Sequence, residues 1–354
     1  MTGHIRKLDS LRGLAALIVV VSHYANESHW CEAIGHGAGQ IGVMLFFLLS
    51  GFLMAYLYFG PAPDARALRG FALARIARVV PLFYAVAIGS FVLTRWAPPP
   101  ARDLLFPIGD GRDLAADLLF LHGQIVLWTI PPEIEFYALF ALAWAGGPRV
   151  HRLLVPLVAT LVALIYAFGA PVTRFSLWGI TVSTEIVEAL PYFAVGSLIG
   201  YAYRRTHVAE ARQKSLYVAA LLLIPVTYPA IFTALTGYVH GLWASPLVLA
   251  VLAGVFAVVI FLVPDRSSVL ANPCGDFLGK ISYSMYLLHV PVLMHLERAG
   301  WTVGGAGCLL FLAITIGVAT ASYLLIEAPA RRGLRRLGGG AAPLPARAVG
   351  EPAS

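Results

Sequence analysis

The chain has 354 residues, of which 59% are hydrophobic and only 12% are charged. A soluble domain usually carries about 25% charged residues, so this composition excludes an ordinary soluble protein and indicates lipid as the solvent. Apolar runs of about 18 or more residues can satisfy their backbone polar groups in a bilayer only as helices or as a closed barrel. The runs are continuous rather than alternating, so the sequence predicts an all-α, polytopic bundle of transmembrane helices.

The apolar runs predict about ten spans, and the basic residues predict their orientation. The formal net charge of +7 lies in short segments between the runs, which is a topology signal rather than a nucleic-acid footprint. If the N-terminus is cytoplasmic, nearly all Lys and Arg fall in cytoplasmic segments, as the positive-inside rule expects. Ten spans then place both termini in the cytoplasm. The expected spans are residues 8–27, 41–59, 76–94, 133–147, 150–169, 184–203, 215–236, 241–263, 281–297 and 305–328.

The chain is expected to form one membrane domain, residues 1–332. The short basic start leads into an apolar run without a small-residue cleavage site, so we expect a retained first helix rather than a signal peptide. Residues 333–354, rich in Gly, Ala and Pro, are expected to be a disordered cytoplasmic tail. Three isolated cysteines, Cys31, Cys274 and Cys308, predict neither a disulfide framework nor a metal site.

The first span contains ionisable residues at both ends. Asp9 and Arg12 lie three residues apart on one helix face and can form an ion pair. His23 lies fourteen residues beyond Asp9, which places it about 21 Å further along the axis and toward the outer side. Charges at membrane depth are costly, so such residues are functional candidates. The alternatives are a structural ion pair for Asp9 and Arg12, and a packing role for His23.

Two further positions carry charge into the membrane. Arg75 and Arg78 share a helix face at the cytoplasmic end, and their guanidinium groups suit phosphate oxygens; a simple membrane anchor is the alternative. Glu133 follows two prolines and falls in the first turn of a helix, where a carboxylate suits the positive dipole end; an N-terminal cap is the alternative. The predicted topology places Glu133 with His23 at the outer side.

The last third of the chain carries polar groups inside a predicted span. Ser282, Tyr283 and His289 either contact a substrate or form hydrogen bonds between helices. Glu185 and Glu188 open another span near the outer face, where they either touch an acceptor or are solvated helix-end carboxylates.

Taken in order, these stretches resemble the acyltransferase 3 family of membrane O-acyltransferases. Two mild departures are Thr129-Ile130, where the family commonly has Ser-Leu, and the double proline before Glu133. The matching stretches are Leu8-Asp9-x-Leu11-Arg12-Gly13 with His23, Gly42-Val43-x-x-Phe46-Phe47-x-Leu49-Ser50-Gly51-Phe52, Arg75-x-x-Arg78-Val79-x-Pro81, Trp128-Thr129-Ile130-x-x-Glu133-x-x-Phe136-Tyr137, Ser282-Tyr283-x-x-Tyr286-Leu287-x-His289 and Glu327-x-Pro329.

The resemblance implies transfer of an acetyl or other short acyl group from acyl-coenzyme A to a carbohydrate hydroxyl, in the cell membrane and, in a bacterium, the inner membrane. His23 is then the expected base, oriented by Glu133. Arg75 and Arg78, with Arg12 and Asp9, are expected to bind the donor, which is a co-substrate rather than a resident cofactor. Substrate contacts are expected from Tyr137, Trp128, Ser282, Tyr283 and His289.

Two other classes use the same residue types. A transporter or flippase of a glycan or small metabolite also places His, Glu and Arg inside the membrane. An acyltransferase-like sensor without turnover is a third possibility. Release of thiol from acyl-coenzyme A, dependent on His23, separates both from an enzyme.

Overall fold

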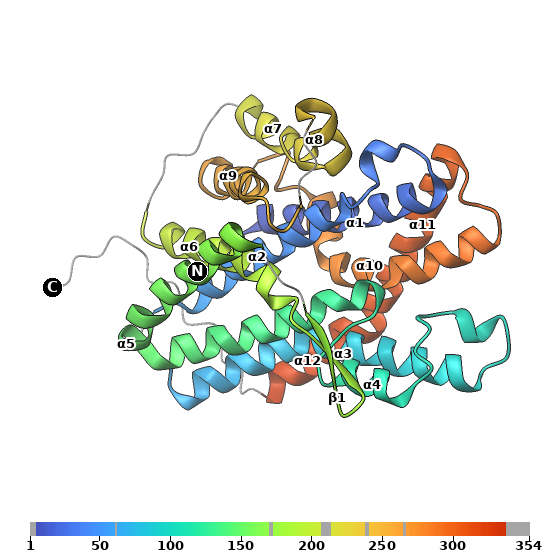
Figure 1. The fold of residues 1–354 in the computed structure, drawn as a ribbon, viewed down its shortest axis with the longest axis horizontal. Coiled ribbons are helices and arrows are strands. Elements are labelled where there is room, and N and C mark those ends of the chain that lie inside the picture. Colours follow the sequence, from blue (N-terminus) through green and yellow to red (C-terminus); the bar gives the residue numbers. More distant parts are fainter. Residues whose placement is uncertain are drawn as a thin grey trace.

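The computed structural model describes residues 5–60, 62–169, 173–206, 214–237, 241–264 and 267–337. It is a bundle of helices with one small hairpin, as Figure 1 shows. The α-helices are α1 (Arg6–Ser28), α2 (Gly39–Tyr58), α3 (Ala65–Trp96), α4 (Gly111–Leu118), α5 (Ile130–Phe168), α6 (Ile186–Tyr203), α7 (Lys214–Leu222), α8 (Pro229–Thr236), α9 (Pro246–Leu262), α10 (Pro273–Arg298), α11 (Gly304–Ser322) and α12 (Ala328–Leu337).

The remaining elements are short. Strands β1 (Arg174–Leu177) and β2 (Ile180–Ser183) form an antiparallel hairpin between the predicted spans 150–169 and 184–203. Of the short helical turns, η3 (Ile125–Thr129) precedes α5, η4 (Pro225–Thr227) lies between α7 and α8, and a π-helical turn, η5 (Tyr323–Glu327), joins α11 to α12. In the view of Figure 1, α7, α8 and α9 gather at one side of the molecule and the hairpin lies at the opposite side.

The predicted all-α membrane fold is confirmed in its main features. Among the described residues, six helical segments are long and apolar enough to cross a membrane, or seven if one bent pair counts as a span. The count of ten spans and the cytoplasmic placement of both termini stay predictions. The six segments are Arg6–Ser28, Glu32–Tyr58, Ala65–Trp96, Ile125–Gly147, Ile186–Tyr203 and Gly304–Leu334.

The single helix predicted at residues 215–236 is broken in the structure. The chain there forms α7, η4 and α8, with an 88° bend between the two helical parts. Pro225 and Pro229 begin η4 and α8, and each lacks the N–H that a continuous helix would need. The hydrophobic run was read correctly, but its two prolines break the helix.

The predicted break between the spans 133–147 and 150–169 is present as a kink within one helix. Helix α5 continues past this point, but Gly147 has φ 61° and ψ −159°, which breaks the helical geometry. A positive φ is readily available to glycine. At the C-terminal end, α12 reaches Leu337, so residues 333–337 belong to the bundle. The rest of the predicted tail lies outside the described residues.

Glycines let the central helices approach closely. A Cβ added to Gly279 of α10 would meet Asp9 of α1 at 2.5 Å, and one added to Gly42 of α2 would meet the Ala15 carbonyl oxygen at 2.4 Å. Small residues at such crossings are typical of membrane helix packing. Helix α1 is therefore held against both α2 and α10.

The segment before α5 enters the bundle instead of staying at its surface. Leu127, Thr129 and Ile130 are buried, at 0%, 5% and 2% exposure. The Tyr286 hydroxyl of α10 donates to the Val126 carbonyl and accepts from Thr129 Oγ1. Helix α5 therefore begins inside the protein, and its first turn carries Glu133 into the interior.

Candidate functional site

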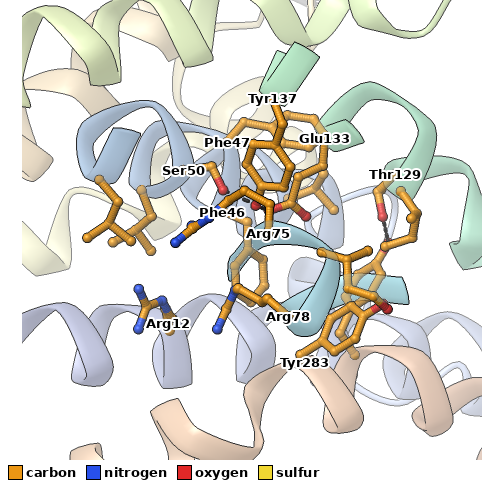
Figure 2. Close-up of a pocket in the computed structure, with 16 residues that line it drawn as sticks. Arg12, Phe46, Phe47, Ser50, Arg75, Arg78, Thr129, Glu133, Tyr137 and Tyr283 are labelled. Atoms are coloured by element: carbon orange, nitrogen blue, oxygen red, sulfur yellow. Dashed lines mark hydrogen bonds between the residues drawn. The ribbon is translucent and has the colours of Figure 1, made fainter. Parts of the chain in front are cut away.

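Three arginines line a narrow cavity of about 50 Å³, which we call the arginine cavity. Figure 2 shows the guanidinium groups of Arg12, Arg75 and Arg78 facing one part of it, the first from α1 and the other two from α3. Its full lining is Arg12, Val43, Phe46, Phe47, Leu49, Ser50, Leu53, Arg75, Arg78, Val79, Thr129, Ile130, Glu133, Tyr137, Tyr283 and Tyr286.

Neighbouring residues hold the arginines in place and leave some of their N–H groups able to donate hydrogen bonds to a ligand. Arg12 pairs with Asp9 at 2.8 Å, as the sequence predicted. Arg75 lies over the rings of Tyr58 and Tyr137, with its guanidinium carbon 5.9 and 5.7 Å from their centroids. Its buried Nε atom has no hydrogen-bond partner among the described residues. Three guanidinium groups against the single carboxylate of the lining give this cavity an excess of positive charge.

Glu133 belongs to this arginine cavity, where it accepts hydrogen bonds from Ser50 Oγ at 2.9 Å and from the Tyr137 hydroxyl. His23, which the sequence expected beside it, lines a different cavity. The buried course of residues 125–130 starts α5 inside the bundle, whereas the predicted topology places that start at the outer side.

His23 lines a second and larger cavity of about 470 Å³, which we call the histidine cavity. A volume in this range is typical of small-molecule sites. Its lining mixes amides, carboxylates and two tryptophans. The complete set is Val19, Ser22, His23, Asn26, Gly37, Gly39, Gln40, Val43, Ile125, Val126, Trp128, Arg174, Glu185, Glu188, Trp243 and Tyr286.

The hydrogen bond of His23 indicates which ring nitrogen carries the proton. Its Nδ1 atom lies 3.0 Å from the Val19 carbonyl oxygen, which can only accept. The neutral ring therefore carries its proton on Nδ1 and keeps a lone pair on Nε2. A ring held by a backbone carbonyl in this way can act as a base through Nε2.

The ring beside His23 is that of a second histidine. The rings of His23 and His289 meet edge to face, with centroids 4.9 Å apart. Nδ1 of His289 lies 2.6 Å from the Tyr286 carbonyl oxygen, and its buried Nε2 atom has no hydrogen-bond partner among the described residues. By the same reasoning, that Nε2 atom carries an unused lone pair. The sequence singled out both histidines but did not pair them.

Two residues, Val43 and Tyr286, line both cavities. They form a shared wall between the arginine cavity and the histidine cavity. Arg12 and His23 lie eleven residues apart on α1, which corresponds to about 16 Å along the helix. The two cavities are therefore neighbouring compartments arranged along one helix.

Three of the other predicted site residues divide between these compartments. Tyr137 and Tyr283 line the arginine cavity, and Trp128 lines the histidine cavity. Ser282 lines neither cavity; it is fully buried and donates to the Gly279 carbonyl of its own helix, α10, rather than to another helix. Sequence reasoning missed Trp243, because it counted this residue as part of the apolar span 241–263, whereas α9 begins only at Pro246 and Trp243 lines the histidine cavity.

A comparison with family models finds a match over residues 5–327, to a model described as an acyltransferase domain. The chain belongs to the acyltransferase 3 family. No curated protein and no solved structure matches it. The family match runs from the start of α1 to the end of η5, so both cavities of this membrane acyltransferase lie within the family's own domain. The resemblance read from six short motifs is thereby confirmed.

Proposed function

We propose that this acyltransferase moves an acetyl or other short acyl group from acyl-coenzyme A to a hydroxyl group of a carbohydrate. The observation that carries the proposal is the pair of adjoining cavities, one rich in arginine and one containing a histidine with a free Nε2 lone pair. Acyl transfer needs cationic groups that bind the phosphates of the donor, and beside them a base that takes the proton of the acceptor hydroxyl.

The arginine cavity suits the phosphate-bearing part of the donor. Guanidinium groups donate parallel hydrogen bonds to phosphate oxygens, and three of them face this cavity. A volume of about 50 Å³ is too small for a nucleotide. We therefore expect the adenosine to stay outside, with phosphates at the arginines and the pantetheine arm directed past Tyr286 toward His23.

The histidine cavity suits the chemical step. Nε2 of His23 takes the proton of the acceptor hydroxyl while the hydroxyl oxygen attacks the thioester carbonyl carbon. The carbon–sulfur bond then breaks, the new ester remains on the acceptor, and the protonated imidazole returns its proton to the thiolate of coenzyme A. His289 lies where its unused lone pair can support the imidazole through the step.

The proposal includes a direction across the cell membrane. If the segments rich in Lys and Arg are cytoplasmic, the arginine cavity receives cytosolic acyl-coenzyme A and the histidine cavity faces the other side. The acceptor is then a surface polysaccharide, a glycolipid or a glycosylated natural product. In a bacterium, the membrane is the inner one.

The test is release of coenzyme A from acetyl-coenzyme A by the purified protein, with carbohydrate acceptors present. We expect His23→Gln to lower the rate by about 10² to 10⁴, the usual contribution of a general base. His29→Gln is the matched control, because His29 is an exposed residue just beyond the end of the same helix. Full activity of His23→Gln would remove the base assignment.

The same assay separates the alternatives. A transporter or flippase, or a sensor without turnover, would leave the thioester intact in every sample. Mass spectrometry of the acceptor then identifies which acyl group has been added and to which hydroxyl.

A further inference from the structure

The histidine cavity differs from the arginine cavity in the sign of its charge. Glu185 and Glu188 contribute two carboxylates, and Arg174 contributes one cation. With His23 neutral, the formal charge of the lining is negative. Since opposite charges attract and like charges repel, this cavity does not suit a second phosphate or carboxylate ligand.

Glu185 has an unused hydrogen-bonding position. It is 4% exposed, and its Oε2 atom accepts from the Ser183 hydroxyl. Its Oε1 atom lies 3.6 Å from Arg174 Nη2, an ion-pair distance, but has no hydrogen-bond partner among the described residues. A buried carboxylate oxygen without a hydrogen bond is uncommon, and Glu185 belongs to the lining of a large cavity. A ligand hydroxyl that donates to Oε1 would complete its hydrogen bonding.

Two tryptophans supply apolar surface in the same cavity. Trp128 and Trp243 meet edge to face with ring centroids 5.8 Å apart. Trp243 is also braced edge to face by Tyr192, at a centroid separation of 5.6 Å. Both tryptophans are partly exposed, so their surfaces are available to a ligand. An indole ring offers a rigid, flat apolar face at low entropic cost.

We infer that the histidine cavity binds a neutral, polyhydroxylated ring as acceptor and discriminates against acidic rings through Glu185 and Glu188. The inference rests on the proposed acyl transfer and specifies its acceptor. A sugar ring has hydroxyl groups at its rim and apolar C–H groups on its faces, so it can donate to the carboxylates while packing on a tryptophan. One of its hydroxyl groups then lies toward His23.

The experiment compares two acceptors that differ only at C6, methyl β-D-glucopyranoside and methyl β-D-glucopyranosiduronate. Coenzyme A release from saturating acetyl-coenzyme A gives kcat/KM for each acceptor. We expect the wild-type protein to prefer the neutral ring at least tenfold. Glu188→Gln should reduce that preference to within about threefold, because it removes one of the two repelling charges.

Two further variants make the result specific. Glu185→Gln should act like Glu188→Gln, although it also alters the bond from Ser183. Glu297→Gln removes a charge from an exposed residue of α10 outside the cavity lining, and should leave the preference unchanged. Size-exclusion profiles of all variants confirm that each is folded.

The outcomes separate this inference from the proposed function. Coenzyme A release with the acidic ring at an equal or higher kcat/KM would overturn the neutral-ring inference and leave acyl transfer intact. An undiminished preference in both Glu185→Gln and Glu188→Gln would overturn the role of the carboxylates. No release with either ring, from protein that still binds acetyl-coenzyme A, would overturn the acceptor inference. The proposed function would fall with it only if no other carbohydrate supported release.

Discussion

The arginine cavity and the histidine cavity share a wall yet differ in charge and size. The first holds three guanidinium groups against one carboxylate in about 50 Å³. The second holds two carboxylates, one guanidinium group and two tryptophans in about 470 Å³. Two substrates that must meet inside one membrane protein can thus be sorted by charge before they react.

The difference between the cavities also changes the role expected of each charged residue. A carboxylate hydrogen-bonded to His23 would orient the imidazole and stabilise its protonated form, as in a catalytic triad. In the arginine cavity, Glu133 instead balances part of the positive charge and fixes the Ser50 and Tyr137 hydroxyl groups. His289 occupies the place beside His23 that Glu133 had been expected to fill.

Of the variants that test the difference between the two cavities, His289→Asn is expected to have the largest effect on kcat. It removes the lone pair next to the proposed base, and we expect kcat to fall by about tenfold or more with the donor KM unchanged. His295→Asn is the matched control. His295 also lies on α10, with Nδ1 2.7 Å from a backbone carbonyl and a buried Nε2 without a partner among the described residues, but the ring that meets His23 is that of His289.

Glu133→Gln should give the opposite kinetic pattern. Because it removes a negative charge from among three arginines, we expect the donor KM to fall a few fold while kcat changes by less than tenfold. Steady-state kinetics with acetyl-coenzyme A as the varied substrate measure both values. A collapse of kcat to the level of His23→Gln would restore Glu133 as the functional partner of the base.

Charge reversal at Arg75 and Arg78 should weaken only the donor side. Each change to Glu replaces a guanidinium group that donates hydrogen bonds to phosphate by a carboxylate that repels phosphate. The KM for acetyl-coenzyme A should therefore rise about tenfold or more. The acceptor KM should stay within twofold. Arg66→Glu, an exposed position on the same helix, controls for net charge. An unchanged donor KM in both variants would dismiss the arginines as donor ligands.

The smallest effect is expected at the wall between the cavities. Tyr286→Phe deletes the hydroxyl group that bonds the Val126 carbonyl and Thr129 Oγ1, and should lower the free energy of unfolding by about 1 kcal/mol. Tyr192→Phe is the control, because the buried Tyr192 hydroxyl has no partner among the described residues. Thermal unfolding in detergent should show a lower midpoint for the first variant only.

The sequence by itself determined the properties that depend on composition and local spacing. The apolar runs predicted a helical membrane protein, and the three-residue spacing predicted the Asp9–Arg12 ion pair found at 2.8 Å. Six short motifs identified the family that the family model confirms. Such features follow from helical periodicity and from the cost of charge in lipid, both of which can be read along the chain.

Only the tertiary structure decided which of these residues meet. The depth at which α5 begins depends on how residues 125–130 pack against Tyr286, a contact about 160 residues away in sequence. The pairing of His23 with His289 likewise depends on the close approach of α1 to α10 at Gly279. Hydropathy locates apolar segments but carries no information on how deep a broken segment enters the bundle, so the sequence did not anticipate the hydrogen bonds of Glu133 with Ser50 and Tyr137.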